Sequence, residues 1–211
     1  MNSASDTIVP VSHVLFDLGG VLLDWSPARL YQKLIPDAEE RAYFLDNICT
    51  LAWHNAHDAG ASFADNGDAL IALYPHHEQL IRAWSERWLE MFDGYIEGVP
   101  ALIDRLDAAN VPLYALSNMP KDPWPVMREH FVYLQRFRDV VVSADEKCVK
   151  PGAEIYHIAL KRMGGLTPNT VLFIDDRRDN IDAAEALGFR THLFTTASGL
   201  EIALKKLKLI S

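Results

Sequence analysis

Residues 11–21 read VSHVLFDLGGV, an apolar run that ends on an aspartate and is followed by two glycines. The run Val11–Phe16 has the composition of a strand that is buried on both faces, which is typical of parallel sheets. In such sheets ligands bind beyond the carboxyl ends of the strands, where Asp17 stands. The glycines allow a tight backbone turn around a ligand. This stretch therefore predicts an α/β fold with a site around Asp17.

Four further short apolar runs follow along the chain, with helical patterns between the later ones. They are Val111–Leu116, Asp139–Ser143, Thr170–Ile174 and Arg190–Phe194. Leu102, Ile103 and Leu106 share one helical face, and residues 155–163 repeat the pattern. Strands and helices that alternate in this way predict a Rossmann-like, doubly wound parallel sheet with right-handed crossovers.

The interval between the first two strands departs from this alternation. Residues 27–96 contain no run that predicts a strand, and their apolar residues, among them Trp84 and Trp88, recur at helical spacing. A segment of about 70 residues is too long for an unstructured loop in a compact domain. We expect a core domain of residues 1–26 and 97–211, with a purely helical domain inserted over 27–96.

Composition narrows the class of protein. The 211 residues carry 20 basic and 29 acidic side chains, and this net charge of −9 argues against a nucleic-acid partner. No stretch approaches the roughly 20 apolar residues of a membrane span, and Met1 to Pro10 lacks the features of a signal peptide. Cys49 and Cys148 fit no metal-ligand spacing and are expected to be unpaired thiols in a reducing compartment. We expect a soluble cytoplasmic protein.

Polar side chains follow the later apolar runs as Asp17 follows the first. Ser117 and Asn118 end the second run and can donate hydrogen bonds to a phosphate oxygen. Lys150 follows the third run and could offer a fixed cation to a phosphoryl group. Asp175 and Asp176 end the fourth, where adjacent carboxylates suit Mg²⁺. Each motif alone also fits a turn or a helix cap, but jointly they predict one site at the sheet edge.

In this order, the set resembles the four motifs of the haloacid dehalogenase-like (HAD) hydrolase superfamily, most of whose members are phosphatases. The resemblance covers nearly the whole chain, and the helical insertion resembles the small cap domain of the C1 members. The first motif, Phe16-Asp17-Leu18-Gly19-Gly20-Val21, resembles a sugar-phosphatase-like branch. The resemblance implies a Mg²⁺-dependent phosphoric monoester hydrolase that acts on a small phosphorylated metabolite through an aspartyl-phosphate intermediate.

The resemblance also implies roles for individual residues. Asp17 corresponds to the nucleophile, and Lys150 to the lysine that neutralises the nucleophile and the phosphate. Ser117, followed by Asn118, corresponds to the phosphate-binding motif.

The metal site that the resemblance implies contains Asp17, the Gly19 carbonyl and Asp176, with Asp175 in support. The residues that steady the metal's waters or the lysine in the family correspond to Asp179 and Asn180.

Gly19 departs from the pattern of most phosphatases of the superfamily. They carry a second aspartate two residues after the nucleophile, which protonates the leaving group and later activates water. Glycine cannot carry a proton, and general acid–base catalysis is worth about 10²- to 10⁴-fold. We expect either an activated substrate, such as a sugar 1-phosphate or an acyl phosphate, or a proton supplied by the inserted domain.

The missing aspartate leaves two alternatives. Haloacid dehalogenases also lack it, use no metal and attack a carbon that bears a halide, but their fourth motif lacks the acid pair Asp175 and Asp176. A non-catalytic binding protein that retains the fold is the second alternative. The presence of Asp17, Ser117, Lys150 and Asp176 together argues against it.

The segment Trp53–Gly60 is the most polar and aromatic part of the insertion and resembles a cap loop that overhangs the active site. His54 and His57 could contact substrate or supply the missing proton, since histidine titrates near neutrality. They could also be surface residues at a helix end. Trp25, just after the first motif, is expected to wall the entrance.

Overall fold

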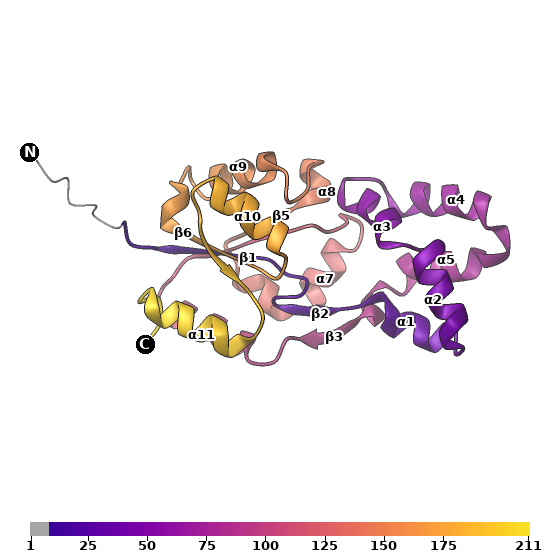
Figure 1. Ribbon diagram of the computed structural model, residues 1–211, viewed down its shortest axis with the longest axis horizontal. Coiled ribbons are helices and arrows are strands. Elements are labelled where there is room, and N and C mark those ends of the chain that lie inside the picture. The colour runs from indigo at the N-terminus through magenta and orange to yellow at the C-terminus, as the bar shows by residue number, and fades with distance from the viewer. Residues whose placement is uncertain (1–8) are drawn as a thin grey trace, which may run out of the picture.

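The computed structural model describes residues 9–211, and its centre is a five-stranded sheet in which β1 is the middle strand. All neighbouring strands are parallel, so the predicted doubly wound sheet is confirmed (Figure 1). The strand order is β5 (Asp139–Val142), β4 (Leu113–Ser117), β1 (His13–Phe16), β6 (Val171–Asp175) and β7 (Arg190–Leu193).

Helices cover both faces of the sheet. Successive side chains of a strand point to opposite faces, so apolar strands such as β1 present apolar side chains on both faces that must be buried. Val14 and Phe16 of β1 belong to one buried cluster, whereas Leu15 belongs to the other. The first cluster includes α6 (Val99–Ala108) and α11 (Ala197–Lys206), and the second includes α9 (Ala153–Arg162) and α10 (Arg178–Ala186). Shorter elements complete the core: α7 (Trp124–His130), α8 (Ser143–Glu146) and 3-10 turns at Val132–Arg136 and Pro168–Thr170.

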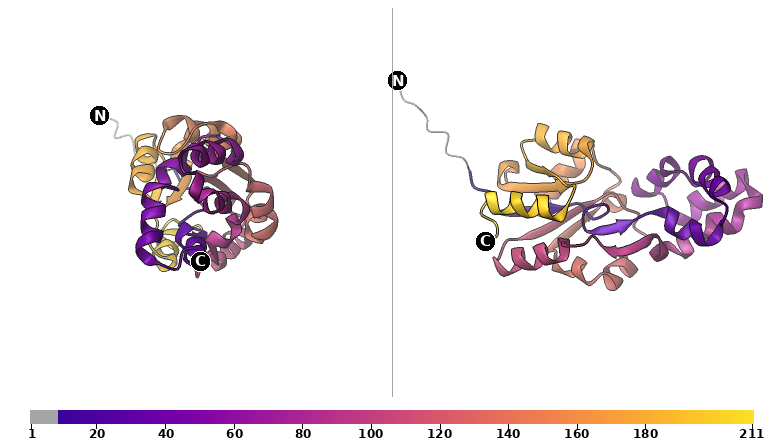
Figure 2. Two further views of the ribbon diagram at one scale, coloured as in Figure 1. Left: turned by 90° about the vertical axis from the view of Figure 1, so that its right-hand side faces the viewer. Right: turned by 60° about the horizontal axis from the view of Figure 1, so that its bottom comes forward.

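Residues Pro27–Met91, here called the α1–α5 lobe, lie at the end of the molecule toward which β1 runs (Figures 1 and 2). Side chains of Asp37, Thr50 and Ser62 cap its helices by accepting from backbone N–H groups of the first turn. The lobe contains α1 (Pro27–Leu34), α2 (Ala38–Asn47), α3 (Leu51–Asp58), α4 (Phe63–Leu73), α5 (Glu78–Glu86) and 3-10 turns at Pro75–His77 and Trp88–Met91.

Two short antiparallel strands, β2 (Leu23–Trp25) and β3 (Phe92–Tyr95), connect the lobe to the core. The prediction that residues 27–96 are purely helical is therefore wrong, because β3 lies inside that interval. Four residues that include Gly94 give no strand signal of their own. The strand forms through its pairing with β2, which is distant in the sequence.

Two further expectations can be compared with the described residues. Cys49 and Cys148 are free thiols, as predicted. None of the helices within residues 9–211 has the length and apolar character needed to cross a bilayer. The prediction that Met1 to Pro10 is not a signal peptide concerns mostly residues 1–8, which lie outside the described residues.

Candidate active site

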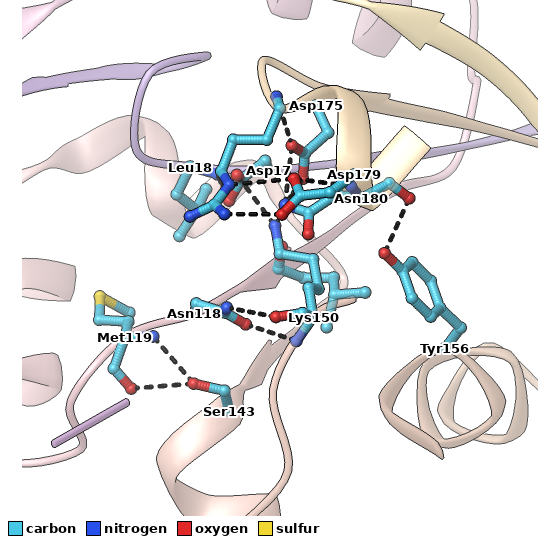
Figure 3. Close-up of polar contacts among 12 residues, drawn as sticks. Asp17, Leu18, Asn118, Met119, Ser143, Lys150, Tyr156, Asp175, Asp179 and Asn180 are labelled. Atoms are coloured by element: carbon cyan, nitrogen blue, oxygen red, sulfur yellow. Dashed lines mark hydrogen bonds and ion pairs between the residues drawn. The ribbon is translucent and has the colours of Figure 1, made fainter. Parts of the chain in front are cut away.

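The polar residues predicted to follow the strands meet at the carboxyl edge of the sheet (Figure 3). Asp17 leaves β1, Ser117 ends β4 and Asp175 ends β6, and these three strands are neighbours in the sheet. A cavity of about 320 Å³ opens at this edge. Asp17, Ser117 and Lys150 line it, together with Asp176.

Lys150 is the cation at the centre of this group. Its side chain is only 1% exposed, and its Nζ lies 2.9 Å from Asp17 Oδ2 and 2.7 Å from Asp175 Oδ2. Burial alone would lower the pKa of Lys150, but the carboxylates of Asp17 and Asp175 outweigh burial and raise it. Lys150 is therefore a fixed positive charge between two acids.

Asn118 holds the backbone on which Lys150 stands. Its Oδ1 accepts from Lys150 N at 2.8 Å, and its Nδ2 donates to Lys150 O at 3.0 Å (Figure 3). The side chain of Asn118 thus positions the lysine. A phosphate contact, as predicted for this residue, would use its main-chain N–H beside the Ser117 hydroxyl.

Asp175 is fully buried and both of its oxygens accept hydrogen bonds. Besides Lys150, the donors are Arg177 N at 2.9 Å and Asn180 Nδ2 at 3.0 and 3.1 Å. These bonds fix the carboxylate against the lysine. Asp179 instead pairs with Arg177 at 2.7 Å and is not among the residues that line the cavity.

The acidic residues could hold a divalent cation. Ligand atoms of Asp17, Asp175 and Asp176 lie within 4.8 Å of one another. Burial, helped by the neighbouring carboxylates and opposed by Lys150, raises the pKa of Asp17, and burial and Asp175 raise the pKa of Asp176. Three carboxylates face one lysine, so the cluster lacks positive charge.

An unpaired polar atom beside the carboxylates supports the same interpretation. Asn180 Oδ1 is buried and has no hydrogen-bond partner among residues 9–211. Asn180 also lines the cavity, so its Oδ1 can accept a hydrogen bond from a water bound to a cation. Carboxylate, carbonyl and water oxygens are the ligands that Mg²⁺ prefers, and the donor set fits this ion.

The two glycines of the first motif differ in what they require. Gly20 has a φ of +74°, and an added Cβ would lie 2.4 Å from Asp176 Oδ2. An added Cβ at Gly19 would meet no atom within 4 Å. Gly20 is therefore needed for the turn and for the position of Asp176, whereas the space at Gly19 would admit a side chain.

This contrast predicts the effects of two alanine substitutions. Gly20→Ala should weaken Mg²⁺ binding by at least about tenfold, because its Cβ displaces the Asp176 carboxylate. The left-handed backbone should cost about 1–2 kcal/mol of stability in addition. Titration calorimetry with Mg²⁺ and thermal unfolding measure both effects. Gly19→Ala is the matched control, and equal Mg²⁺ affinity in the two variants would refute the prediction.

Apolar side chains from the core, from β2 and β3 and from the α1–α5 lobe form part of the cavity lining, here called the apolar wall. Trp25 lines it, as predicted for the entrance, and stacks on His54 with ring centroids 5.3 Å apart. Trp84 is buried in the lobe, whereas Trp88 is both buried and part of the cavity lining. The other large apolar side chains of the wall are those of Leu18, Leu23, Leu51, Phe92, Met119 and Met127.

The two histidines of α3 are interior residues, so the surface alternative is wrong. His54 lies among tryptophans and lines the cavity, and burial lowers its pKa to about 3. His57 is fully buried, its Nε2 lies 2.9 Å from Asn66 Nδ2, and it is not among the cavity-lining residues. Burial lowers its pKa to about 4. Both rings are neutral at neutral pH, which makes them poor proton donors.

Two charged residues of the cavity were not singled out from the sequence. Arg177 follows the fourth motif, and Asp58 ends α3 inside the segment Trp53–Gly60. Asp58 is the sole carboxylate of that segment. A carboxylate in this polar and aromatic segment is the feature of the sequence that could have indicated a role for Asp58, but a lone acid at a helix end is ordinarily exposed.

Comparisons with known proteins give a family and a fold. A model of the family described as haloacid dehalogenase-like hydrolase matches residues 11–188. The sesquiterpene phosphatase astK of Aspergillus oryzae is 24% identical over 185 residues, which cover 82% of this chain and 85% of that protein.

Solved structures share the fold at low sequence identity. The HAD family enzyme bt-2542 of Bacteroides thetaiotaomicron, in complex with magnesium and inorganic phosphate, gives a TM-score of 0.67 at 22% identity. It covers 88% of this chain and 95% of its own. The L-2-haloacid dehalogenase of Xanthobacter autotrophicus gives 0.62 at 18% identity, with 86% and 76% covered. Because both are neighbours, the fold alone does not choose between their chemistries.

Proposed function

Because this chain belongs to the haloacid dehalogenase-like hydrolase family, we propose that it is a Mg²⁺-dependent phosphoric monoester hydrolase with Asp17 as its nucleophile. The observation that carries the proposal is the buried Lys150 between Asp17 and Asp175, with Asp176 beside them. The acid pair favours a phosphatase over a metal-independent dehalogenase. The phosphatase among the relatives supports the same choice.

In the proposed reaction a carboxylate oxygen of Asp17 forms a bond to phosphorus while the ester P–O bond breaks. The leaving oxygen takes a proton, and water then attacks the phosphorus of the aspartyl-phosphate and releases phosphate. Lys150 neutralises the nucleophile and the phosphate, and the Ser117 hydroxyl donates to a phosphate oxygen. Mg²⁺, held by Asp17, the Gly19 carbonyl and Asp176, would supply further positive charge at the phosphate.

The α1–α5 lobe is proposed to act as the cap of the active site, and the predicted cap segment 27–96 contains this lobe together with β3. Residues of the lobe, among them His54, Asp58 and Trp88, line the same cavity as Asp17 and Lys150. A lid of this kind excludes water from the intermediate and completes the binding site.

The apolar wall favours a substrate with a hydrocarbon leaving group over a sugar phosphate. Trp25, Trp88 and Phe92 offer aromatic surface, and Leu23 and Met127 extend it. Burying each methylene of a ligand there contributes about 0.8 kcal/mol, whereas sugar hydroxyls would lose hydrogen bonds to water. The relative named as a sesquiterpene phosphatase agrees with this preference.

Phosphate release in the presence and absence of Mg²⁺ tests the proposed function. Medium-chain alkyl and isoprenoid monophosphates should be hydrolysed with a KM at least about tenfold lower than that of glucose 1-phosphate. A chelator should abolish the activity, and added Mg²⁺ should restore it. Release of halide from a 2-haloacid in the presence of chelator, without phosphatase activity, would instead establish the dehalogenase alternative.

A further inference from the structure

Asp58 is a charged residue of the cavity that has no role among the nucleophile, the phosphate-binding residues or the metal ligands. It is the last residue of α3, is 6% exposed and lines the same cavity as Asp17 and Lys150. Its backbone is tied to the core, because Ser143 Oγ donates to Asp58 O at 2.7 Å and accepts from Met119 N at 2.9 Å. Figure 3 shows Ser143 beside Met119, below the Lys150 group.

The carboxylate of Asp58 is poorly satisfied for a buried charge. Its Oδ1 is buried and has no hydrogen-bond partner within residues 9–211, and His54 Nε2 is 3.5 Å away. The C-terminal end of a helix is unfavourable for a negative charge. An unpaired buried carboxylate lowers stability, so this position favours the protonated form of Asp58, and a perturbed acid in a cavity is a candidate for a functional role.

Its surroundings also set its protonation state. Burial raises the pKa of Asp58 to about 7, and Lys150 opposes the rise. His54 lies beside it but is neutral at neutral pH, because burial lowers its pKa to about 3. Asp58 can therefore hold a proton and release it near neutral pH, as a group that acts first as acid and then as base must do.

We propose that Asp58 is the general acid–base of this hydrolase, in place of the second aspartate that is missing at Gly19. The inference rests on the proposed function. The protonated Asp58 gives its proton to the leaving oxygen as the P–O bond breaks. Its carboxylate then takes a proton from the water that attacks the aspartyl-phosphate. Ester and water become alcohol and phosphate, and both Asp17 and Asp58 return to their starting states.

Each of the other titratable groups that line the cavity either has a different proposed role or has a pKa that does not suit proton transfer near neutral pH. Asp176 belongs to the cluster proposed to hold Mg²⁺, and Lys150 is locked between two carboxylates. Hydrogen bonds with Asp179, followed by the charges of the surrounding acids, raise the pKa of Arg177, so Arg177 does not release a proton near neutral pH. His54 is too weak a base to be protonated near neutral pH. Asp58 is the remaining acid of the described cavity.

Asp58→Asn tests the role through its dependence on the leaving group. In single-turnover experiments the variant should transfer phosphate from an alkyl monophosphate about 10²- to 10⁴-fold more slowly than the wild type. First-turnover release of 4-nitrophenol from 4-nitrophenyl phosphate should change by less than about tenfold, because this leaving group needs little protonation. Steady-state turnover of both esters should fall, because the base for the second step is lost.

Two further variants complete the test. Asp46→Asn makes the same substitution at an exposed site of the lobe, and we expect wild-type rates. Adding Gly19→Asp to Asp58→Asn should recover at least about tenfold of the alkyl phosphate rate, since the space at Gly19 is open. Because Asn matches Asp in shape and removes a buried charge, Asp58→Asn should melt no lower than the wild type.

The outcomes separate the two proposals. If Asp58→Asn slows both esters equally in the first turnover, or slows neither, Asp58 is not the acid and this inference is overturned. If the wild type releases phosphate from no ester with Mg²⁺, the proposed function itself fails. Rescue by Gly19→Asp together with leaving-group dependence would establish the role.

Discussion

Asp17→Asn is expected to lower kcat for phosphate ester hydrolysis by at least about 10⁴-fold, the scale of losing a covalent nucleophile. The amide has nearly the shape of the carboxylate but cannot attack phosphorus. Its oxygen can still accept from Leu18 N or from Lys150 Nζ, which lie 2.6 and 2.9 Å from the two Asp17 oxygens, and Lys150 keeps its other carboxylate partner, Asp175. The loss should therefore appear in kcat and not in folding.

The same substitution should leave the free energy of unfolding unchanged or higher when Mg²⁺ is absent. Burial and the adjacent Asp175 and Asp176 raise the pKa of Asp17, so its ionised form is unfavourable in the folded protein. An amide removes this repulsion, and Lys150 keeps its pair with Asp175 at 2.7 Å. Substitutions that remove an unfavourable charge from an active site often stabilise the protein while lowering its activity.

Mass spectrometry of acid-quenched reactions would check the assignment directly. The wild type should carry a phosphate on Asp17, and the variant should carry none. Thermal unfolding without Mg²⁺ provides the control for folding. Residual activity above about one per cent, or a phosphate on another residue, would mean that the nucleophile lies elsewhere.

The residues around Asp17 could be predicted from the sequence because their signals are local. Asp17, Ser117 and Asp175 each end an apolar run that forms a strand. Parallel strands bring such residues to one edge, so recognising the runs was sufficient to group them. Asp176 directly follows Asp175, whereas Lys150 lies beyond α8 and reaches the same cavity from there.

The lobe side of the cavity could not be predicted in the same way. The burial of His54 depends on Trp25 and Trp84, which come from different parts of the chain. Asp58 is buried because Ser143 holds the end of α3 against the core. The strand Phe92–Tyr95 likewise exists through its partner β2. In each case a tertiary contact overrides what the local sequence indicates.

Lys150→Met is expected to give the largest loss of stability of any single substitution in the site. Removing one partner of a buried ion pair leaves an uncompensated charge, which costs about 3–5 kcal/mol. Here the side chains of Lys150 and Asp175 are 1% and 0% exposed, and Asp17 would then face Asp175 without a cation. For a protein of this size the melting temperature should fall by about 10 °C or more. Lys161→Met, at an exposed position of α9, is the control and should melt like the wild type.

A double-mutant cycle would attribute that loss to the charges. Adding Asp175→Asn to Lys150→Met should recover at least about 1 kcal/mol, because it removes one of the two carboxylates left without a partner. Mg²⁺ should raise the melting temperature of Lys150→Met by more than it raises that of the wild type, since the ion would then supply the only cation of the cluster. If the two substitutions were additive and Mg²⁺ stabilised both proteins equally, Lys150 would be a packing residue. Its place between Asp17 and Asp175 favours the opposite result, in which Lys150 and Mg²⁺ together neutralise the three carboxylates of the cluster.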